Sequence, residues 1–127
     1  MVIKMYLITK IFKFDSAHNL LNYNGACENI HGHTYILETT LKGKKKNNGL
    51  VIDFTEIKKT VGDLVISKLD HMSLNDIITQ PTAENILEWI WNELYKPFEE
   101  KGADLYELKL FEGPNSYAVY RGGKDFE

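Results

Sequence analysis

The stretch VIDFTEIKKTVGDLVISKL, residues 51–69, decides the fold because the hydrophobic period changes within it. Before this stretch apolar residues alternate with polar ones, as they do in half-buried strands. Within it the apolar residues Ile57, Val61, Leu64 and Val65 fall on one helical stripe. The stretch therefore predicts a helix that follows strands and packs by one face.

Two strands are predicted upstream of this helix. Residues 3–14 alternate, and residues 33–41 alternate again. Their expected anchors are Met5, Leu7, Phe12 and Phe14 in the first strand and Tyr35, Leu37, Thr39 and Leu41 in the second. Residues 18–30 are rich in Asn and Gly and predict a loop, while residues 43–49 predict a turn.

A second helix and two further strands are predicted downstream. The helix opens at PTAEN, residues 81–85, with Thr82 as its N-cap and Glu84 in its positive first turn. Its apolar stripe is Leu87, Trp91, Leu94 and Phe98. Residues 105–111 and 117–121 then predict two strands joined by a hairpin.

The resulting order is ββααββ, which is an α+β fold with a four-stranded antiparallel sheet and two helices on one face. Such a sheet has open edges, and open edges favour pairing with other subunits. We therefore expect a homo-oligomer.

Composition limits the function classes. The 127 residues suit a single domain, residues 1–127, and the net charge of −3 argues against nucleic acid as a partner. No apolar run approaches the roughly 20 residues that a membrane span needs. Cys27 is the single cysteine, so an internal disulfide is excluded and a reducing compartment is expected. We expect a soluble, cytoplasmic protein.

Three of the four histidines cluster around CENIHGH, residues 27–33. His31 and His33 would share one face of a strand, and an antiparallel partner strand would bring His18 beside them. Three protein ligands with an open position are typical of catalytic zinc, whereas a fourth ligand from Cys27 would indicate structural zinc. A third interpretation, ordinary polar residues at strand ends, also stays open.

Two further groups carry chemistry. Asp70 and His71 are adjacent in LDHMSLND, residues 69–76. A carboxylate can orient an imidazole for proton transfer, but only if the backbone there is not helical, and a simple helix end is the alternative. Glu112 ends a predicted strand, where it is either solvated or available to bind an amidine-like edge.

Five motifs in this order resemble the 6-pyruvoyl-tetrahydropterin synthase / 6-carboxy-tetrahydropterin synthase family. They are FDSAH (14–18), CENIHGH (27–33), LDHMSLND (69–76), PTAEN (81–85) and FEGPNSYAVY (111–120). The resemblance implies a tunnelling fold, in which ββααββ subunits join their sheets into a barrel as trimers or dimers of trimers. It also implies Zn²⁺ and a substrate, 7,8-dihydroneopterin triphosphate.

The resemblance also implies site residues. His18, His31 and His33 would hold zinc, and Cys27 would be the catalytic base. Asp70 and His71 would form a catalytic pair brought from a neighbouring subunit. Glu112 would anchor the pterin, with Thr82 and Glu84 near the pterin pocket.

The family divides by product, and residues 27 and 28 bear on the choice. Cys27 fits the spacing CxxxHGH, and the short chain resembles the bacterial enzymes that form 6-carboxy-5,6,7,8-tetrahydropterin and acetaldehyde for queuosine. Glu28 fits ExxHGH, which the resemblance links to 6-hydroxymethyl-dihydropterin for folate. A 6-pyruvoyl-tetrahydropterin product, and a zinc- or pterin-binding module without catalysis, are further alternatives.

Overall fold

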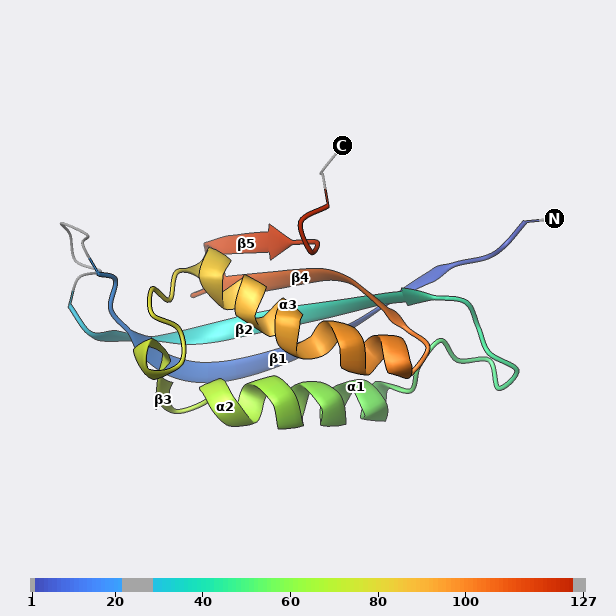
Figure 1. Ribbon diagram of the computed structural model, residues 1–127, viewed down its shortest axis with the longest axis horizontal. Coiled ribbons are helices and arrows are strands. Elements are labelled where there is room, and N and C mark those ends of the chain that lie inside the picture. Colours follow the sequence, from blue (N-terminus) through green and yellow to red (C-terminus); the bar gives the residue numbers. More distant parts are fainter. Residues whose placement is uncertain (1, 22–28, 125–127) are drawn as a thin grey trace.

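The computed structural model describes residues 2–21 and 29–124 (Figure 1). Its elements are β1 (Tyr6–His18), β2 (His31–Gly43), α1 (Phe54–Val61), the π-helical turn η2 (Gly62–Ile66), α2 (Ser67–Leu69), β3 (Met72–Ser73), the 3₁₀ turn η3 (Leu74–Asp76), α3 (Ala83–Glu100), β4 (Asp104–Glu112) and β5 (Tyr117–Tyr120). The predicted ββααββ order is confirmed, and the helix predicted from residues 51–69 consists of α1, η2 and α2 in succession.

Within the described residues the sheet has five strands in the order β3-β1-β2-β4-β5, not the predicted four. The additional strand, β3, pairs in parallel with Ser16 and Ala17 of β1. A strand of two residues is too short to produce an alternating pattern, so the sequence could not indicate it. The pairs β1–β2, β2–β4 and β4–β5 are antiparallel, as predicted.

The helices cover one face of the sheet. α3 packs on β4 and β5, while α1 and α2 pack on β1 (Figure 1). The anchors predicted for β2 all lie buried beneath the helices. For the first predicted strand, residues 3–14, the anchors are half wrong, because Phe14 is buried but Leu7 in β1 and Met5 just before it are 55% and 47% exposed. Odd-numbered residues of β1 point to the uncovered face, since the side chains of a strand alternate.

Local sequence explains where the helices begin. The Asp53 carboxylate accepts a hydrogen bond from the Thr55 N–H at 2.8 Å and so caps α1. The Thr82 hydroxyl accepts from the Asn85 N–H at 3.1 Å and caps α3, as predicted. The stripe predicted for α3 is buried. None of the described helices is both long and apolar enough to cross a membrane.

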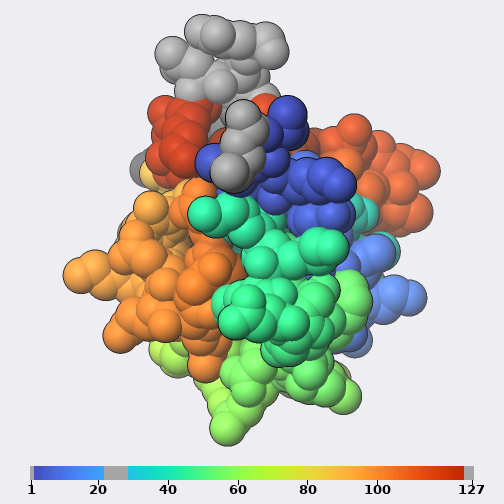
Figure 2. Space-filling view, turned by 90° about the vertical axis from the view of Figure 1, so that its right-hand side faces the viewer, coloured from blue at the N-terminus to red at the C-terminus, as the bar shows by residue number. Residues whose placement is uncertain are grey.

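The turn between β2 and α1 lies at the opposite end of the molecule from the last residues of β1 and the first residues of β2 (Figure 1). Figure 2 views this end, where segment 44–53 lies between the helices α1 and α3 and the N-terminal residues. The Lys46 ammonium donates to the Lys101 carbonyl oxygen at 2.9 Å, which joins the turn to the end of α3.

Candidate active site

The register of the sheet brings four side chains together. His18 is the last residue of β1 and pairs directly with His31, the first residue of β2. His33 pairs with Ser16, and Glu112, the last residue of β4, pairs with Tyr35. Three strand ends therefore meet at one point on the helix-covered face.

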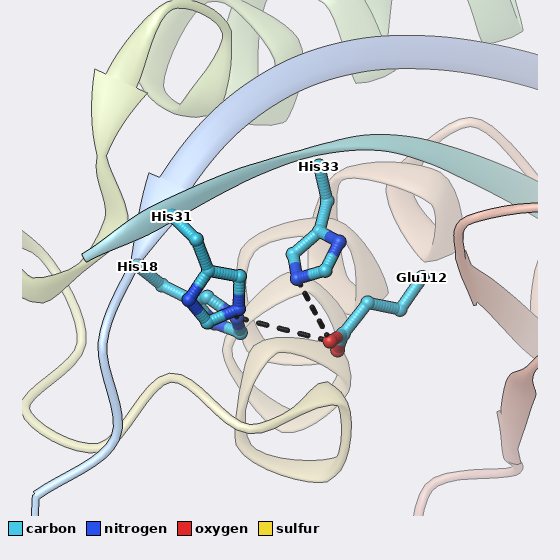
Figure 3. Close-up of side chains that lie close together, drawn as sticks. All are labelled: His18, His31, His33 and Glu112. Carbon is cyan, nitrogen blue, oxygen red and sulfur yellow. Dashed lines mark hydrogen bonds and ion pairs between the residues drawn. The ribbon is translucent and has the colours of Figure 1, made fainter. Parts of the chain in front are cut away.

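Figure 3 shows that the three imidazoles and the Glu112 carboxylate point toward one another. The His18 and His31 Nε2 atoms are 3.2 Å apart. The Glu112 Oε1 atom lies 3.1 Å from His33 Nε2 and 3.8 Å from His18 Nε2. All four ligand atoms lie within 4.8 Å of one another.

The hydrogen bonds on the far side of two rings fix their tautomers. The His18 Nδ1–H donates to the Pro81 carbonyl at 2.8 Å, and the His31 Nδ1–H donates to the Asn29 carbonyl at 2.7 Å. A proton on Nδ1 leaves the Nε2 lone pair free to bind a metal. Both Nε2 lone pairs are therefore directed into the cluster.

The His33 imidazole is also suited to bind a cation. Burial lowers the pKa of His33, with the neighbouring His18 and His31 acting in the same direction and Glu112 opposing them. The His33 Nε2 atom is buried and makes no hydrogen bond with any described residue, although the Glu112 oxygen is near. A cation placed between this nitrogen and the carboxylate oxygen would be attracted by both groups.

The spacing suits zinc in particular. Tetrahedral zinc with Zn–N distances of roughly 2.0–2.1 Å separates two ligand nitrogens by about 3.3 Å, and the His18 and His31 nitrogens are 3.2 Å apart. The residues thus fit a three-histidine zinc site with Glu112 beside it. The carboxylate that the resemblance places on the pterin lies against the histidines in this structure.

Tyr35 packs beside the cluster and contacts His18. It is fully buried, its ring stacks on Phe14 with centroids 5.0 Å apart, and its hydroxyl lies 3.4 Å from His18 Nδ1. Burial, reinforced by Glu112, raises the pKa of Tyr35, so its hydroxyl stays protonated. Tyr35 therefore places a neutral polar group beside the first histidine.

Asp70 and His71 form the predicted pair on a non-helical backbone. Asp70 is extended, with ψ of 131°, and His71 has a φ of 58°. The Asp70 Oδ2 atom lies 3.0 Å from His71 Nδ1. A hydrogen bond from the Asp15 N–H lowers the pKa of Asp70, and His71 lowers it further. The carboxylate is therefore charged and orients the imidazole.

This pair belongs to a second cluster, which includes Asp15 and is separate from the four-residue cluster. Asp15, Thr34 and His71 line an open hollow of about 510 Å³. The His71 side chain is 78% exposed, so it is free to contact another molecule. Among the described residues, the Asp70–His71 pair does not join the histidines of its own chain.

The remaining predicted residues lie at the start of α3 and outside the described part of the chain. Glu84 lines a smaller hollow of about 310 Å³ together with Glu112 and Tyr117. Thr82 is occupied in capping the helix. Cys27 and Glu28 lie outside the described residues.

Sequence reasoning missed the groups that hold the histidines. The Pro81 and Asn29 carbonyls act through the main chain, which leaves no signal in residue type. Tyr35 was predicted only as a core anchor, because the alternating pattern of its strand does not reveal what the Tyr35 hydroxyl contacts. Only the folded structure shows these neighbours.

Comparisons with known proteins show which family this chain is similar to. Residues 7–123 match the family model described as 6-pyruvoyl tetrahydropterin synthase. A 6-carboxy-5,6,7,8-tetrahydropterin synthase from Synechocystis sp. is 36% identical over 124 residues, which cover 91% of this chain and 93% of that protein. A 6-pyruvoyl tetrahydrobiopterin synthase from Dictyostelium discoideum is 34% identical over 132 residues, which cover 91% and 96%.

A third relative carries a different name. The dihydroneopterin monophosphate aldolase of Pyrococcus furiosus is 42% identical over 108 residues, covering 84% of this chain and 88% of that protein. The solved 6-pyruvoyl tetrahydropterin synthase of Caenorhabditis elegans superposes with a TM-score of 0.82 at 24% identity, covering 95% and 98% of the two chains, and so shares the fold. From its sequence and its fold, this chain belongs to the 6-pyruvoyl tetrahydropterin synthase family.

Proposed function

We propose that the protein is a zinc-dependent lyase that converts 7,8-dihydroneopterin triphosphate and one water to 6-carboxy-5,6,7,8-tetrahydropterin, acetaldehyde and triphosphate, a step toward queuosine. The observation that carries the proposal is the convergence of three imidazole Nε2 atoms, two of them with their lone pairs directed inward by Nδ1 hydrogen bonds. Relatives named for this product, such as the Synechocystis protein, support the choice.

The proposed roles follow from the chemistry of each group. Zinc held by His18, His31 and His33 would lower the pKa of the substrate hydroxyls. Cys27, four residues before His31, would remove a proton from the side chain as a thiolate. Asp70 keeps His71 oriented for the second proton transfer.

The pterin would lie in the hollow that Glu84 and Glu112 line. There Glu112 would rotate from the histidines to accept hydrogen bonds from the pterin edge, which fixes the side chain at the metal. Thr82 would act indirectly, by capping the helix that carries Glu84.

The proposal includes an assembly of identical subunits, as trimers or dimers of trimers. The exposure of His71 supports it, because this imidazole is accessible to another copy of the chain. A thiol base also needs a reducing compartment, so we place the reaction in the cytoplasm.

Substitution of Cys27 tests whether this residue is the catalytic base or a zinc ligand. We expect Cys27→Ala to retain zinc and lose turnover, because the proposed ligands are the three histidines and the thiol is the proposed base. Metal analysis and product formation on the same preparation check this expectation. A zinc-free variant would show that Cys27 is a ligand and not the base.

A second candidate function is aldol cleavage to 6-hydroxymethyl-dihydropterin, with Glu28 as the base. The relative named dihydroneopterin monophosphate aldolase, at 42% identity, favours it. The test is to incubate the zinc-loaded protein with 7,8-dihydroneopterin triphosphate and to identify products by mass. Acetaldehyde with a 6-carboxy product that needs Cys27 supports the first proposal, whereas 6-hydroxymethyl-dihydropterin that needs Glu28 supports the second. Zinc and pterin binding without turnover would indicate a binding module.

A further inference from the structure

Two side-chain amides hold the main chain that follows β1. The Asn19 N–H donates to Asn75 Oδ1 at 2.9 Å, and Asn75 Nδ2 donates to the Asn19 carbonyl at 2.9 Å. The Leu21 N–H donates to Gln80 Oε1 at 2.7 Å, and Gln80 Nε2 donates to the Leu21 carbonyl at 2.9 Å. Each amide therefore satisfies both main-chain groups of one residue, as a neighbouring strand would.

The same segment contacts the first histidine. The Pro81 carbonyl accepts the hydrogen bond from Nδ1 of His18, which lies one residue before Asn19 and is 1% exposed. The Gln80 carbonyl in turn accepts from the Thr82 N–H at 2.9 Å and from Asn85 Nδ2 at 2.8 Å. Segment 75–81 is thus fixed to α3 on one side and to the end of β1 on the other.

We propose that Asn75 and Gln80, named here the amide clamp, are positioning residues for the metal centre. They align the end of β1 with segment 75–81, and this alignment sets the distance between His18 Nδ1 and the Pro81 carbonyl. That hydrogen bond holds the tautomer and the ring orientation on which metal binding by Nε2 depends. The inference rests on the proposed function, because it takes His18, His31 and His33 as zinc ligands.

The amide group is essential to this role. Only an amide side chain offers an acceptor and a donor side by side, which matches one residue's N–H and carbonyl. Replacing Asn75 by Asp or Gln80 by Glu keeps the shape and the acceptor. It removes one donor and places a negative charge against a carbonyl oxygen.

The experiment measures zinc affinity on the full chain at pH 7.5, by competition with a chromophoric chelator, for wild type, Asn75→Asp and Gln80→Glu. Loss of an outer-shell partner typically weakens metal binding about 10–100-fold, and we expect at least about tenfold weakening in each variant. We also expect the visible spectrum of the Co²⁺-substituted protein to shift, because the ligand geometry changes. Thermal unfolding of the metal-free proteins is recorded in parallel.

Asn48→Asp is the matched control. The Asn48 side chain accepts from the Leu50 N–H at 3.0 Å in the turn at the other end of the molecule, within the segment seen in Figure 2. The same amide-to-acid change there keeps the hydrogen bond and lies far from the histidines. We expect wild-type zinc affinity and an unchanged Co²⁺ spectrum.

The outcomes separate the two proposals. A wild-type protein that binds no zinc contradicts the metal centre itself. A wild type that binds zinc, with clamp variants of equal affinity and identical Co²⁺ spectra, overturns the clamp alone. Clamp variants that bind zinc with wild-type affinity but unfold at a lower temperature without metal would show that the two amides have only a structural role. This result also overturns the inference. If Asn75→Asp does not fold, Gln80→Glu, at a half-exposed side chain, decides the question.

Discussion

At the scale of single residues, the proposed zinc site depends on three imidazoles that share one cation. Removing a ligand leaves too few donors for tight binding. We therefore expect His31→Ala and His33→Ala to bind almost no zinc at micromolar metal, measured by elemental analysis after gel filtration. His71→Ala is the control, because His71 belongs to a separate cluster. It should retain full zinc and lose turnover, and loss of its zinc would contradict the assignment of ligands.

The pKa of His33 gives a pH dependence with a defined sign. Burial lowers this pKa below the ordinary 6.5, so the unfolded chain binds the proton at a higher pH than the folded chain. The contribution of His33 to the free energy of unfolding is fully present above pH 6.5. It is lost as the pH falls through the lowered pKa of His33. Protons also compete with zinc in this range.

We expect the free energy of unfolding of the metal-free protein to fall between pH 7.5 and pH 5, by a larger amount in wild type than in His33→Asn. Urea unfolding at both pH values measures this difference. Equal pH dependence in the two proteins would show that His33 does not titrate as described.

At the scale of elements, α3 links the core to the site, because its first turn carries Glu84 and follows Pro81. Thr82 caps this helix, so we expect Thr82→Ala to lower the free energy of unfolding by about 1 kcal/mol. Thr82→Ser should recover most of this loss, since its hydroxyl can accept the same hydrogen bond from Asn85 N–H. Denaturant unfolding measures both variants. A direct substrate role would instead change KM at unaltered stability.

Element order was predictable because strands and helices have different hydrophobic periods. Ile57, Val61 and Val65 recur at helical spacing and are buried, and the β2 anchors alternate and are buried. β3 was not predictable, because two residues carry no period. Met5 and Leu7 were misassigned because apolar residues occupy both faces of β1, and the sequence does not show which face the helices cover.

The candidate site was predictable in part for the same reasons. The spacing of two positions from His31 to His33 places both on one strand face, and His18 pairs with His31, so it lies beside them as predicted. The main-chain carbonyls and the amide clamp depend on tertiary register, which no local pattern encodes. The resemblance to a family supplied the roles that spacing alone left open.

At the scale of the whole molecule, the open sheet presents apolar side chains on its uncovered face. Leu7 and Ile11 of β1 are 55% and 58% exposed, and Val2, Ile3 and Met5, which precede β1, are between 47% and 85% exposed. We expect light scattering with size exclusion to show trimers or hexamers, because burial of this surface stabilises association. The double variant Leu7→Lys, Ile11→Lys should shift the mass toward the monomer, while Glu88→Lys on the exposed side of α3 should not. A wild-type monomer would contradict the assembly.

The most direct test of the central claim is the product formed by the zinc-loaded protein from 7,8-dihydroneopterin triphosphate, identified by mass spectrometry. The account predicts 6-carboxy-5,6,7,8-tetrahydropterin with acetaldehyde, formed by wild type and abolished in His33→Ala together with the bound zinc. The same product formed at an undiminished rate by zinc-free protein, or no pterin product from the zinc-loaded assembly, would contradict it.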